Sequence, residues 1–265
     1  METFLLCPPD YFNIDYSINP WMTGEKIDIR KAKRQWLDLV AAIQNSGGKV
    51  RTIIPSKDYP DMVFTANAGI VKNNTFIISS MKHSERKGES YYFRNWFKKE
   101  EYNIVDIIPG VSFEGCGDAL VHQDSLIGGY GYRTDLLALE VAAGTFGLSL
   151  FDLRLVDPRF YHLDTCFCKI SDNKAIYYPE AFHKGDIEKL KGAIDLIPIA
   201  EDDSRLFMCN SLRVNNTLLI PTNHSSIGKT IQNSLGIKTQ TVNVSEFLKS
   251  GGSIQCLSLR IKDEI

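Results

Sequence analysis

The feature that most restricts the fold of this chain is a recurring order of short segments. Tight turns that carry Asn or Asp join apolar, β-rich runs within residues 71–75, 170–174 and 214–217. Each of these hairpins is followed by a helical segment and then by another strand. The expected helix starts, near positions 85, 135, 185 and 228, are about 50 residues apart, and such a period predicts a propeller or a solenoid.

The two ends of the chain supply the pieces of a fifth unit. A strand after Gln255 is expected to pair with a strand over 3–7, followed by a helix over 26–46 and a strand over 49–54. A ring closed by both termini leaves no exposed sheet edge. Further helices are expected over 84–100, 134–146, 184–192, 227–235 and 244–250, and further strands over 75–78, 148–156 and 217–220.

Composition and charge exclude several classes of protein. The chain has 265 residues, of which 43% are hydrophobic and 23% are charged, so it is neither disordered nor fibrous. Thirty Lys and Arg stand against 32 Asp and Glu, for a net charge of −2. This balance gives no reason to expect a nucleic-acid or membrane-surface partner. No linker or low-complexity segment divides the chain, so we expect one domain over residues 1–265.

The cysteines and glycines give further expectations. No export signal and no membrane span are evident, and the six cysteines are scattered without a C-x-x-C pair. We therefore expect free thiols in a reducing cytoplasm. Neither a P-loop nor a dinucleotide-binding glycine pattern is present, and no His or Cys pair has metal-ligand spacing. We expect no cofactor and no bound metal.

Four segments concentrate polar residues at the ends of expected strands. Because they fall in separate units, a pseudo-symmetric ring would bring them together on its axis. A Cys, a His, carboxylates and an amide would then share one central pocket. The segments are PDMVFTANAG (60–69), FEGCGD (113–118), YHLDT (161–165) and GGSIQC (251–256).

These motifs, in this order, resemble the guanidine-modifying superfamily, the penteins, over essentially the whole chain. The matching patterns are Glu-Gly-x-Gly-Asp, His-x-Asp and a late Gly-Gly-x-x-x-Cys. The resemblance implies an α/β fold, a five-bladed α/β propeller of ββαβ units with its active site on the axis. Residues 7–12 and 18–22, together with Asn67, most resemble the arginine dihydrolase branch, which is related to arginine deiminase and dimethylarginine dimethylaminohydrolase.

The resemblance and the chemistry of the guanidino group indicate the same catalytic residues. A guanidinium carbon is a poor electrophile because its charge is delocalised, so it needs a strong nucleophile and carboxylates that hold its plane. Cys256 is the expected nucleophile, since a bound cation favours the thiolate. His162 is expected to protonate the departing ammonia and then to activate water, while Glu114 orients His162 and contacts the substrate.

Polar residues of the motifs are expected to bind the guanidino group. Asp164 would accept its N–H bonds. Asn67 stands where arginine deiminases carry an Asp, and an amide offers donors and an acceptor to both a guanidinium and a ureido group. Two alternatives remain open for Asp61, which would contact the substrate or stabilise its turn.

The other expected contacts involve the rest of the substrate. Arg86 and Arg133 match positions at which relatives clamp the α-carboxylate, which suits a guanidinium fork. Phe64 would stack on the guanidinium plane or pack in the core. Asn19 would lie on an N-terminal lid or form an ordinary turn before Pro20.

The expected function is hydrolysis of the guanidino C–N bonds of L-arginine through a covalent Cys-thiouronium intermediate. An arginine dihydrolase gives ornithine, two ammonia and carbon dioxide. A deiminase or a dimethylarginine hydrolase would give citrulline, and an amidinotransferase is a further alternative. A non-catalytic pentein that binds another protein would lack the Cys or the His, yet Cys256, His162 and Glu114 are all present. A homo-oligomer stays an open alternative.

Overall fold

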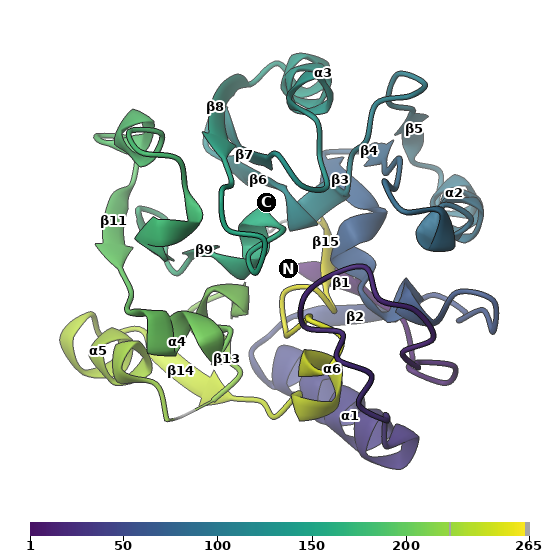
Figure 1. Cartoon of the computed structure of the whole chain (residues 1–265), viewed down its shortest axis with the longest axis horizontal. Coiled ribbons are helices and arrows are strands. Elements are labelled where there is room, and N and C mark those ends of the chain that lie inside the picture. Colours follow the sequence, from purple (N-terminus) through teal and green to yellow (C-terminus); the bar gives the residue numbers. More distant parts are fainter. Residues whose placement is uncertain (223, 263–265) are drawn as a thin grey trace.

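The sheets of this protein follow one another around a single axis. The computed structural model describes residues 1–222 and 224–262. Within them, five three-stranded sheets form a ring, and the strands nearest the two ends of the chain lie near its centre (Figure 1). The expected five-bladed propeller is therefore confirmed.

Each sheet repeats one pattern of strand pairing. The middle strand pairs antiparallel with one neighbour and parallel with the other. A parallel pair requires a crossover, and this is where each unit places its helix or turns. Four of the sheets comprise β3 (Gly69–Lys72), β4 (Thr75–Ile78) and β5 (Asn103–Val105); β6 (Ala119–His122), β7 (Ser125–Tyr130) and β8 (Ser149–Arg154); β9 (Phe167–Lys169), β10 (Lys174–Tyr177) and β11 (Asp195–Pro198); and β12 (Leu212–Val214), β13 (Thr217–Ile220) and β14 (Lys238–Thr241).

The fifth sheet joins the two ends of the chain. Strand β15 (Leu259–Lys262) pairs antiparallel with β1 (Thr3–Leu6), so that Phe4 lies opposite Arg260. Strand β1 pairs parallel with β2 (Lys49–Thr52). Closure by the termini is thus as predicted, and it gives both sides of β1 a hydrogen-bonding partner.

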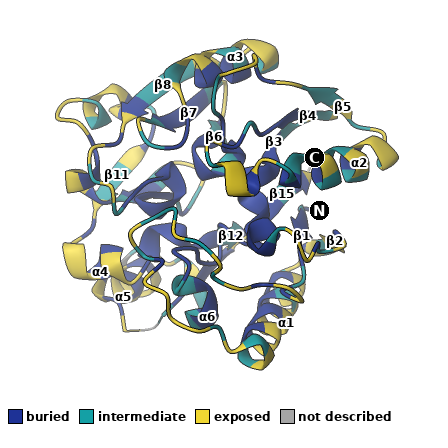
Figure 2. Ribbon diagram, turned by 45° about the vertical axis from the view of Figure 1, so that its right-hand side comes forward, coloured by how far each residue is buried: buried dark blue, intermediate teal, exposed yellow. Residues whose placement is uncertain are grey.

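Helices pack around the outside of the ring. Helix α1 (Ile29–Asn45) begins where the Asp28 carboxylate accepts the N–H groups of Arg30 and Lys31, an N-cap. Helix α5 (Ser226–Ser234) begins at a Ser225 cap. Figure 2 shows buried residues gathered around the centre and exposed ones on the outer faces of α1 and α3. The other helices are α2 (Glu89–Lys99), α3 (Leu136–Phe146) and the short α4 (Glu201–Arg205) and α6 (Ser245–Leu248).

The third unit lacks the α-helix expected over 184–192. Two short 3-10 helices, η6 (Pro179–Ala181) and η7 (Ile187–Leu190), make its crossover instead. Gly185 and Gly192 adopt φ angles of 91° and 83°, and these left-handed residues interrupt the right-handed helical backbone expected over 184–192. The other expected helices form within a few residues of their predicted bounds, although 84–100 begins as the 3-10 helix η3 (Ser84–Arg86).

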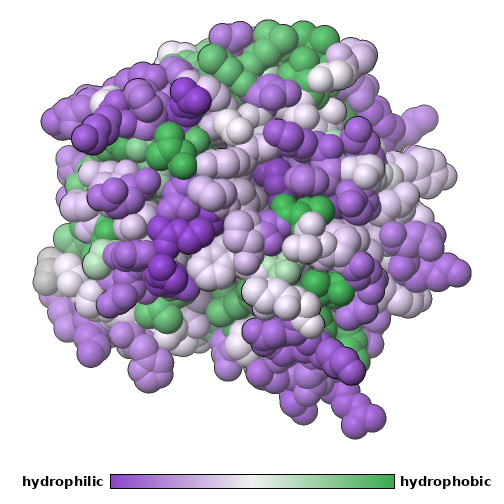
Figure 3. All heavy atoms as spheres, viewed as in Figure 1, coloured by the Kyte–Doolittle hydropathy of each residue, from purple (hydrophilic) through white to green (hydrophobic). Residues whose placement is uncertain are grey.

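Apolar side chains fill the space between the sheets and the surrounding helices. From α1, Trp36, Leu39 and Ile43 point inward at helical spacing and are buried. On the face seen in Figure 3, an apolar region lies at the top, over α3, where Leu137 is 45% exposed. No helix in the described part of the chain is long and apolar enough to cross a membrane.

Candidate active site

The four polar segments meet at the end of the axis that lies away from the hairpin turns. In four units a 3-10 helix directly precedes the first strand, and these helices contact one another around the axis. Gly115 adopts a φ of 57°, and a Cβ there would lie 2.5 Å from the backbone of Gly69. Only glycine therefore permits this approach. The 3-10 helices are η2 (Thr65–Ala68), η4 (Gly115–Gly117), η5 (Leu163–Thr165) and η8 (Met208–Asn210).

Cys256 lies at the centre of this cluster and is 2% exposed. Its Sγ donates to Asp164 Oδ2 at 3.2 Å and accepts from Asn210 Nδ2 at 3.1 Å. Burial, together with the negative charge of Asp164, raises the pKa of the Cys256 thiol. Burial also raises the pKa of Asp164 to about 7. The unliganded site thus holds its thiol protonated, and a cation bound beside the pair would favour both anions.

His162 and Glu114 form the expected pair. His162 Nε2 lies 2.8 Å from Glu114 Oε2, and Arg133 donates to the same oxygen at 2.9 Å. Burial acts to raise the pKa of Glu114, but the hydrogen bond from His162 and the charge of Arg133 bring it below its usual range. Glu114 is therefore ionised and holds the imidazole in place, as a group that orients a general acid and base must do.

Two residues that the sequence analysis did not single out also belong to the cluster. Asp118 Oδ2 lies 3.8 Å from His162 Nε2, and burial raises the pKa of this carboxyl to about 6. Asn210 Oδ1 accepts the N–H groups of Ser253 and Cys256, while its Nδ2 donates to the thiol. Asp118 closes the Glu-Gly-x-Gly-Asp motif and could have been identified from it. No motif marks Asn210.

Besides the hydroxyls of Ser250 and Ser253, four carboxylate or amide side chains of the cluster carry polar atoms that have no hydrogen-bond partner. The buried atoms are Asp61 Oδ1, Asn67 Nδ2, Asp118 Oδ2 and Asp164 Oδ1. An unsatisfied buried polar group costs about 1–3 kcal/mol, so such a concentration indicates a ligand site. Three acceptors and one donor suit a ligand that is rich in N–H groups.

The two predicted clamp arginines have protein partners in this structure. Arg86 is 3% exposed and donates to Glu89, to Asn67 Oδ1 and to the Asp61 carbonyl. Arg133 donates to Glu114 and to the Ile18 carbonyl at 2.8 Å, and its guanidinium lies 4.7 Å from the centre of the Tyr161 ring. Neither presents an open fork, and α-carboxylate binding by either residue stays a prediction.

An N-terminal segment, residues 16–22, covers the cluster. Tyr16 donates to Asp61 Oδ2 at 2.9 Å, and Trp21 Nε1 donates to the Arg159 carbonyl at 2.7 Å. Asn19 donates to the Ser250 carbonyl and accepts the Trp21 N–H. The Asn19 side chain therefore forms a local turn and also ties this segment to the Ser250 carbonyl, while its role on a lid stays a prediction.

Phe64 has core contacts. It meets Phe12 edge-on at 5.8 Å between ring centres. A Cβ on Gly252 would lie 2.2 Å from the Phe64 ring, so the Gly-Gly turn before Cys256 packs directly on that ring. Stacking of Phe64 on a guanidinium stays a prediction.

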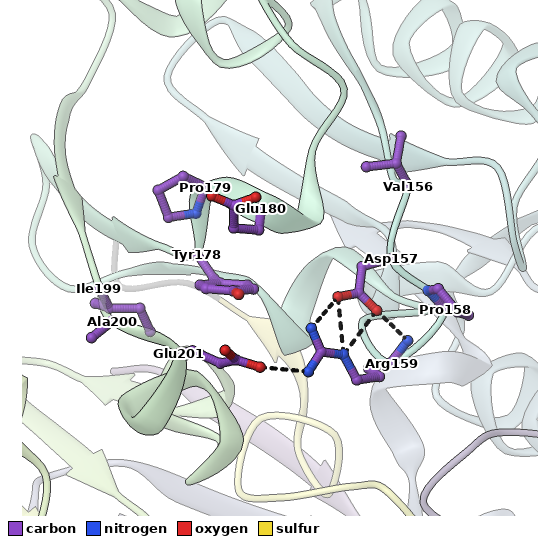
Figure 4. A pocket seen from close by; sticks show the side chains of 10 residues that line it. All are labelled: Val156, Asp157, Pro158, Arg159, Tyr178, Pro179, Glu180, Ile199, Ala200 and Glu201. Carbon is purple, nitrogen blue, oxygen red and sulfur yellow. Dashed lines mark hydrogen bonds and ion pairs between the residues drawn. The ribbon is translucent and has the colours of Figure 1, made fainter.

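Two cavities adjoin other parts of the ring. One of 1100 Å³ borders the hairpin turns at the opposite end of the axis and includes Asp164 and Gln255 in its lining. The other, of 720 Å³, lies between residues 156–159 and 199–201, where Asp157 and Glu201 hold the side chain of Arg159 (Figure 4). Across residues 1–222 and 224–262, no group of three His, Cys, Asp or Glu side chains is arranged to hold a metal ion.

Comparison with known proteins places this geometry in a family. A family model described as N,N dimethylarginine dimethylhydrolase, eukaryotic, matches residues 10–262. The bifunctional arginine dihydrolase/ornithine cyclodeaminase AgrE of Nostoc sp. is 36% identical over 99% of this chain, which spans 38% of that relative's length. The N(G),N(G)-dimethylarginine dimethylaminohydrolase of Mycobacterium tuberculosis is 34% identical, over 97% of this chain and 85% of that protein.

Solved structures agree with this assignment. The N-terminal domain of the arginine dihydrolase ArgZ, in a mutant bound to substrate, superposes with a TM-score of 0.95 at 36% identity and covers 99% of each chain. A dimethylarginine dimethylaminohydrolase structure at 21% identity has a TM-score of 0.84 and shows the same fold. From the match over residues 10–262 and the shared architecture, the chain belongs to the dimethylarginine dimethylhydrolase family of the pentein superfamily.

Proposed function

We propose that this protein is an arginine dihydrolase that converts L-arginine and two water molecules into ornithine, two ammonia and carbon dioxide. The observation that carries the proposal is the set of unpaired buried atoms around Cys256. Asp61 Oδ1 and Asp164 Oδ1 would accept guanidinium N–H groups. Asn67 Nδ2 would donate to the ureido oxygen of citrulline in the second round. The relatives AgrE and ArgZ bear the name arginine dihydrolase, and the ArgZ domain of similar extent was solved with substrate and with product.

In the first round, the Cys256 thiolate attacks the guanidino carbon and forms a C–S bond. The C–N bond to a terminal nitrogen breaks, and His162 supplies the proton with which that nitrogen leaves as ammonia. Water then adds to the thiouronium carbon, losing a proton to His162. Breakage of the C–S bond gives citrulline and restores the thiolate.

In the second round, the same thiolate attacks the ureido carbon of the retained citrulline. The C–N bond to the remaining terminal nitrogen breaks, and His162 again supplies the proton with which that nitrogen leaves as ammonia, so that a thiocarbamate stays on the sulfur. Water releases a carbamate from Cys256, and this carbamate separates into ornithine and carbon dioxide. Glu114 keeps His162 oriented throughout, because its carboxylate stays ionised between His162 and Arg133.

The family name supports a second candidate, hydrolysis of dimethylarginine to citrulline. The pattern of acceptors favours unmethylated arginine. Two methyl groups on one nitrogen remove N–H donors, which would leave Asp61 Oδ1 or Asp164 Oδ1 unsatisfied in the complex. A deiminase that stops at citrulline is the other alternative.

The deciding experiment is product analysis with purified protein. Arginine, asymmetric dimethylarginine and citrulline are supplied separately, and ammonia, citrulline and ornithine are quantified. We expect two ammonia and one ornithine per arginine, and a higher kcat/KM for arginine than for the dimethylated substrate. One ammonia with stoichiometric citrulline would instead identify a deiminase. Preference for the dimethylated substrate would identify a dimethylarginine hydrolase.

The cellular setting is part of the same proposal. None of the six cysteines, all of which lie within the described residues, forms a disulfide, which fits a reducing compartment such as the cytoplasm. The substrate is a small molecule, and the near-neutral charge of the chain provides no attraction for nucleic acid or a membrane surface.

A further inference from the structure

Trp21, in the covering segment, touches three parts of the chain that lie far apart in the sequence. Its Nε1 donates to the Arg159 carbonyl at 2.7 Å. A Cβ on Gly251 would lie 3.1 Å from the Trp21 Cβ. The Trp21 ring meets the Phe207 ring edge-on, with 4.8 Å between the ring centres. Each of these three contacts lies three to five positions before a residue of the polar cluster, namely His162, Cys256 and Asn210.

Phe207 has a backbone conformation that large side chains rarely adopt. Its φ and ψ angles are 58° and 33°, in the left-handed region, and its side chain is only 3% exposed. A bulky residue in this region is strained, and it persists only where the surrounding contacts hold it. Among the described residues, the other non-glycine positions with positive φ are exposed or partly buried polar residues in turns: Asn73, Glu101, Gln123 and Asn215.

The strained residue determines where Asn210 lies. Phe207 directly precedes the 3-10 helix η8, and its carbonyl accepts the N–H of Asn210 at 2.9 Å. Asn210 Nδ2 in turn donates to Cys256 Sγ at 3.1 Å, and Asn210 Oδ1 accepts the Cys256 N–H at 3.1 Å. A hydrogen bond donated to sulfur favours the thiolate. The backbone of Phe207 therefore affects how well Asn210 can support the nucleophile.

The contact between the two rings is strong enough to help hold this backbone. For a residue with a Cβ, the left-handed region is disfavoured about five- to thirtyfold. An edge-to-face aromatic pair favours its own contact about two- to tenfold, beyond the burial of apolar surface. Loss of the Trp21 ring would thus remove an interaction of about the same size as the strain at Phe207.

We propose, on the basis of the proposed function, that Trp21 and Phe207 are positioning residues: the Trp21 ring holds Phe207 in its left-handed conformation, and this keeps the Asn210 amide on the Cys256 thiol. Neither aromatic side chain takes part in the reaction. Closure of the covering segment and preparation of the nucleophile are then one event, because the same ring contact serves both.

Rescue by glycine tests this route. Trp21→Ala should lower kcat about tenfold, because Phe207 then relaxes from the strained conformation. Glycine adopts the left-handed region without a Cβ penalty, so Phe207→Gly added to Trp21→Ala should restore kcat to within about threefold of that of the unmutated protein. A folded double variant that is as slow as Trp21→Ala alone would overturn the proposal. Circular dichroism and Tm verify the fold of each variant.

A double-mutant cycle with Asn210→Asp tests the same route without a change in the core, and it decides if Phe207→Gly does not fold. Asn210→Asp keeps the acceptor and loses the N–H donor to the thiol. If Trp21 acts through this donor, Trp21→Ala should change kcat less than about threefold in the Asn210→Asp background. A full tenfold loss in that background would overturn the proposal, because Trp21 would then act independently of Asn210.

A matched variant separates the ring from the indole N–H. Trp21→Phe keeps an aromatic ring against Phe207 and loses the hydrogen bond to the Arg159 carbonyl. We expect kcat within about threefold of the unmutated value. A loss as large as that of Trp21→Ala would assign the effect to the Arg159 contact and overturn the proposal. Tyr91→Ala, which removes a ring that is 66% exposed on helix α2, provides the baseline for loss of an aromatic side chain.

The outcome is separable from that of the proposed function. Every comparison is a ratio of ammonia or amine release, measured on whichever of arginine and dimethylarginine the unmutated protein consumes. If citrulline is the final product while the rescue and the cycle are as expected, the positioning role stands and the dihydrolase proposal fails. If ornithine is the product and Trp21→Ala acts independently of Phe207 and Asn210, the reverse holds.

Discussion

The two ends of the ring axis are built from the same repeating unit, yet they differ in the burial and hydrogen bonding of their polar side chains. At the motif end, Cys256, Asp164 and Asn67 are almost completely buried, and a covering segment lies over them. At the hairpin end lies the cavity of 1100 Å³, and charged pairs such as Arg213 with Asp172 are at the surface. Buried polar atoms without a partner also occur at the hairpin end, at His122 Nδ1 and Asn215 Oδ1, but more of them gather at the motif end.

The difference shows where the fold is prepared for a ligand. An exposed ion pair contributes about 0–1 kcal/mol, so changes at the hairpin end should matter little. At the motif end, the unpaired atoms of Asp61, Asn67 and Asp164 lower the stability of the free protein and become useful only when a ligand satisfies them. The predictions below compare matched changes at the two ends.

The largest effect is expected for the reacting groups. Cys256→Ser and His162→Ala should each reduce kcat at least about 10³-fold, because one removes the nucleophile and the other removes proton transfer. The control is Cys116→Ser, which replaces a thiol of η4 that lines the large cavity and has no expected part in the reaction, and it should alter kcat less than about threefold. Steady-state ammonia release measures all three, and near-normal activity in Cys256→Ser would refute the assignment of the nucleophile.

The next largest effect is expected for Asn210, which donates a hydrogen bond to the Cys256 thiol. Asn210→Asp keeps the acceptor for the N–H groups of Ser253 and Cys256, removes the N–H donor to Sγ and adds a negative charge. The pKa of the Cys256 thiol should rise, and alkylation by iodoacetamide should slow about tenfold for each unit of that rise. Asn215→Asp, in a hairpin turn, is the control. Equal rates in both variants would show that Asn210 is merely structural.

The pH dependence of binding should separate the two ligands. The pKa of Asp164 is raised to about 7 by burial, so below that pH the carboxyl is protonated and a cation must displace its proton to bind. The affinity of Cys256→Ser for arginine should therefore fall as the pH drops below about 7, by up to tenfold per pH unit for one linked proton. Neutral citrulline should respond less. Parallel titrations from pH 8 to pH 5 check this, and a flat arginine profile contradicts it.

A smaller effect, an increase rather than a decrease in the rate of Cys256 alkylation, is expected when the covering segment is loosened. Asn19→Ala removes bonds to the Ser250 carbonyl and the Trp21 N–H. Each such bond at this partly exposed residue stabilises the closed arrangement by about 0.5 kcal/mol, so the loss of both should make Cys256 react with iodoacetamide roughly five times faster in the absence of substrate. Alkylation that is unchanged or slower would mean that the segment does not limit access.

The smallest effect is expected at the hairpin end itself. Arg213→Ala breaks the exposed pair with Asp172 and should change the free energy of unfolding by less than about 1 kcal/mol, with kcat unaltered. Urea unfolding and ammonia release measure the two quantities. A large loss of activity would require the two ends of the axis to be coupled.

What the sequence could and could not predict follows from the range of the contacts involved. Turn residues and apolar periods are local, so the recurring unit and the closure through β1 and β15 were predictable. The absent helix of the third unit follows from the left-handed conformations of Gly185 and Gly192. Side-chain contacts between residues far apart in the chain produce no recognisable pattern in the sequence. Asn210 meets a thiol 46 positions away, and the orientation of Asn67 depends on Arg86, 19 positions away.

The central claim is that the guanidino carbon becomes attached to Cys256 at the buried end of the axis. Acid quenching during turnover of arginine, followed by digestion and mass spectrometry, tests it directly. We expect an arginine-dependent adduct on the peptide that contains Cys256 and no adduct on peptides with the other five cysteines. Turnover without any adduct on Cys256, or with an adduct on Cys166 or another thiol instead, would contradict this account.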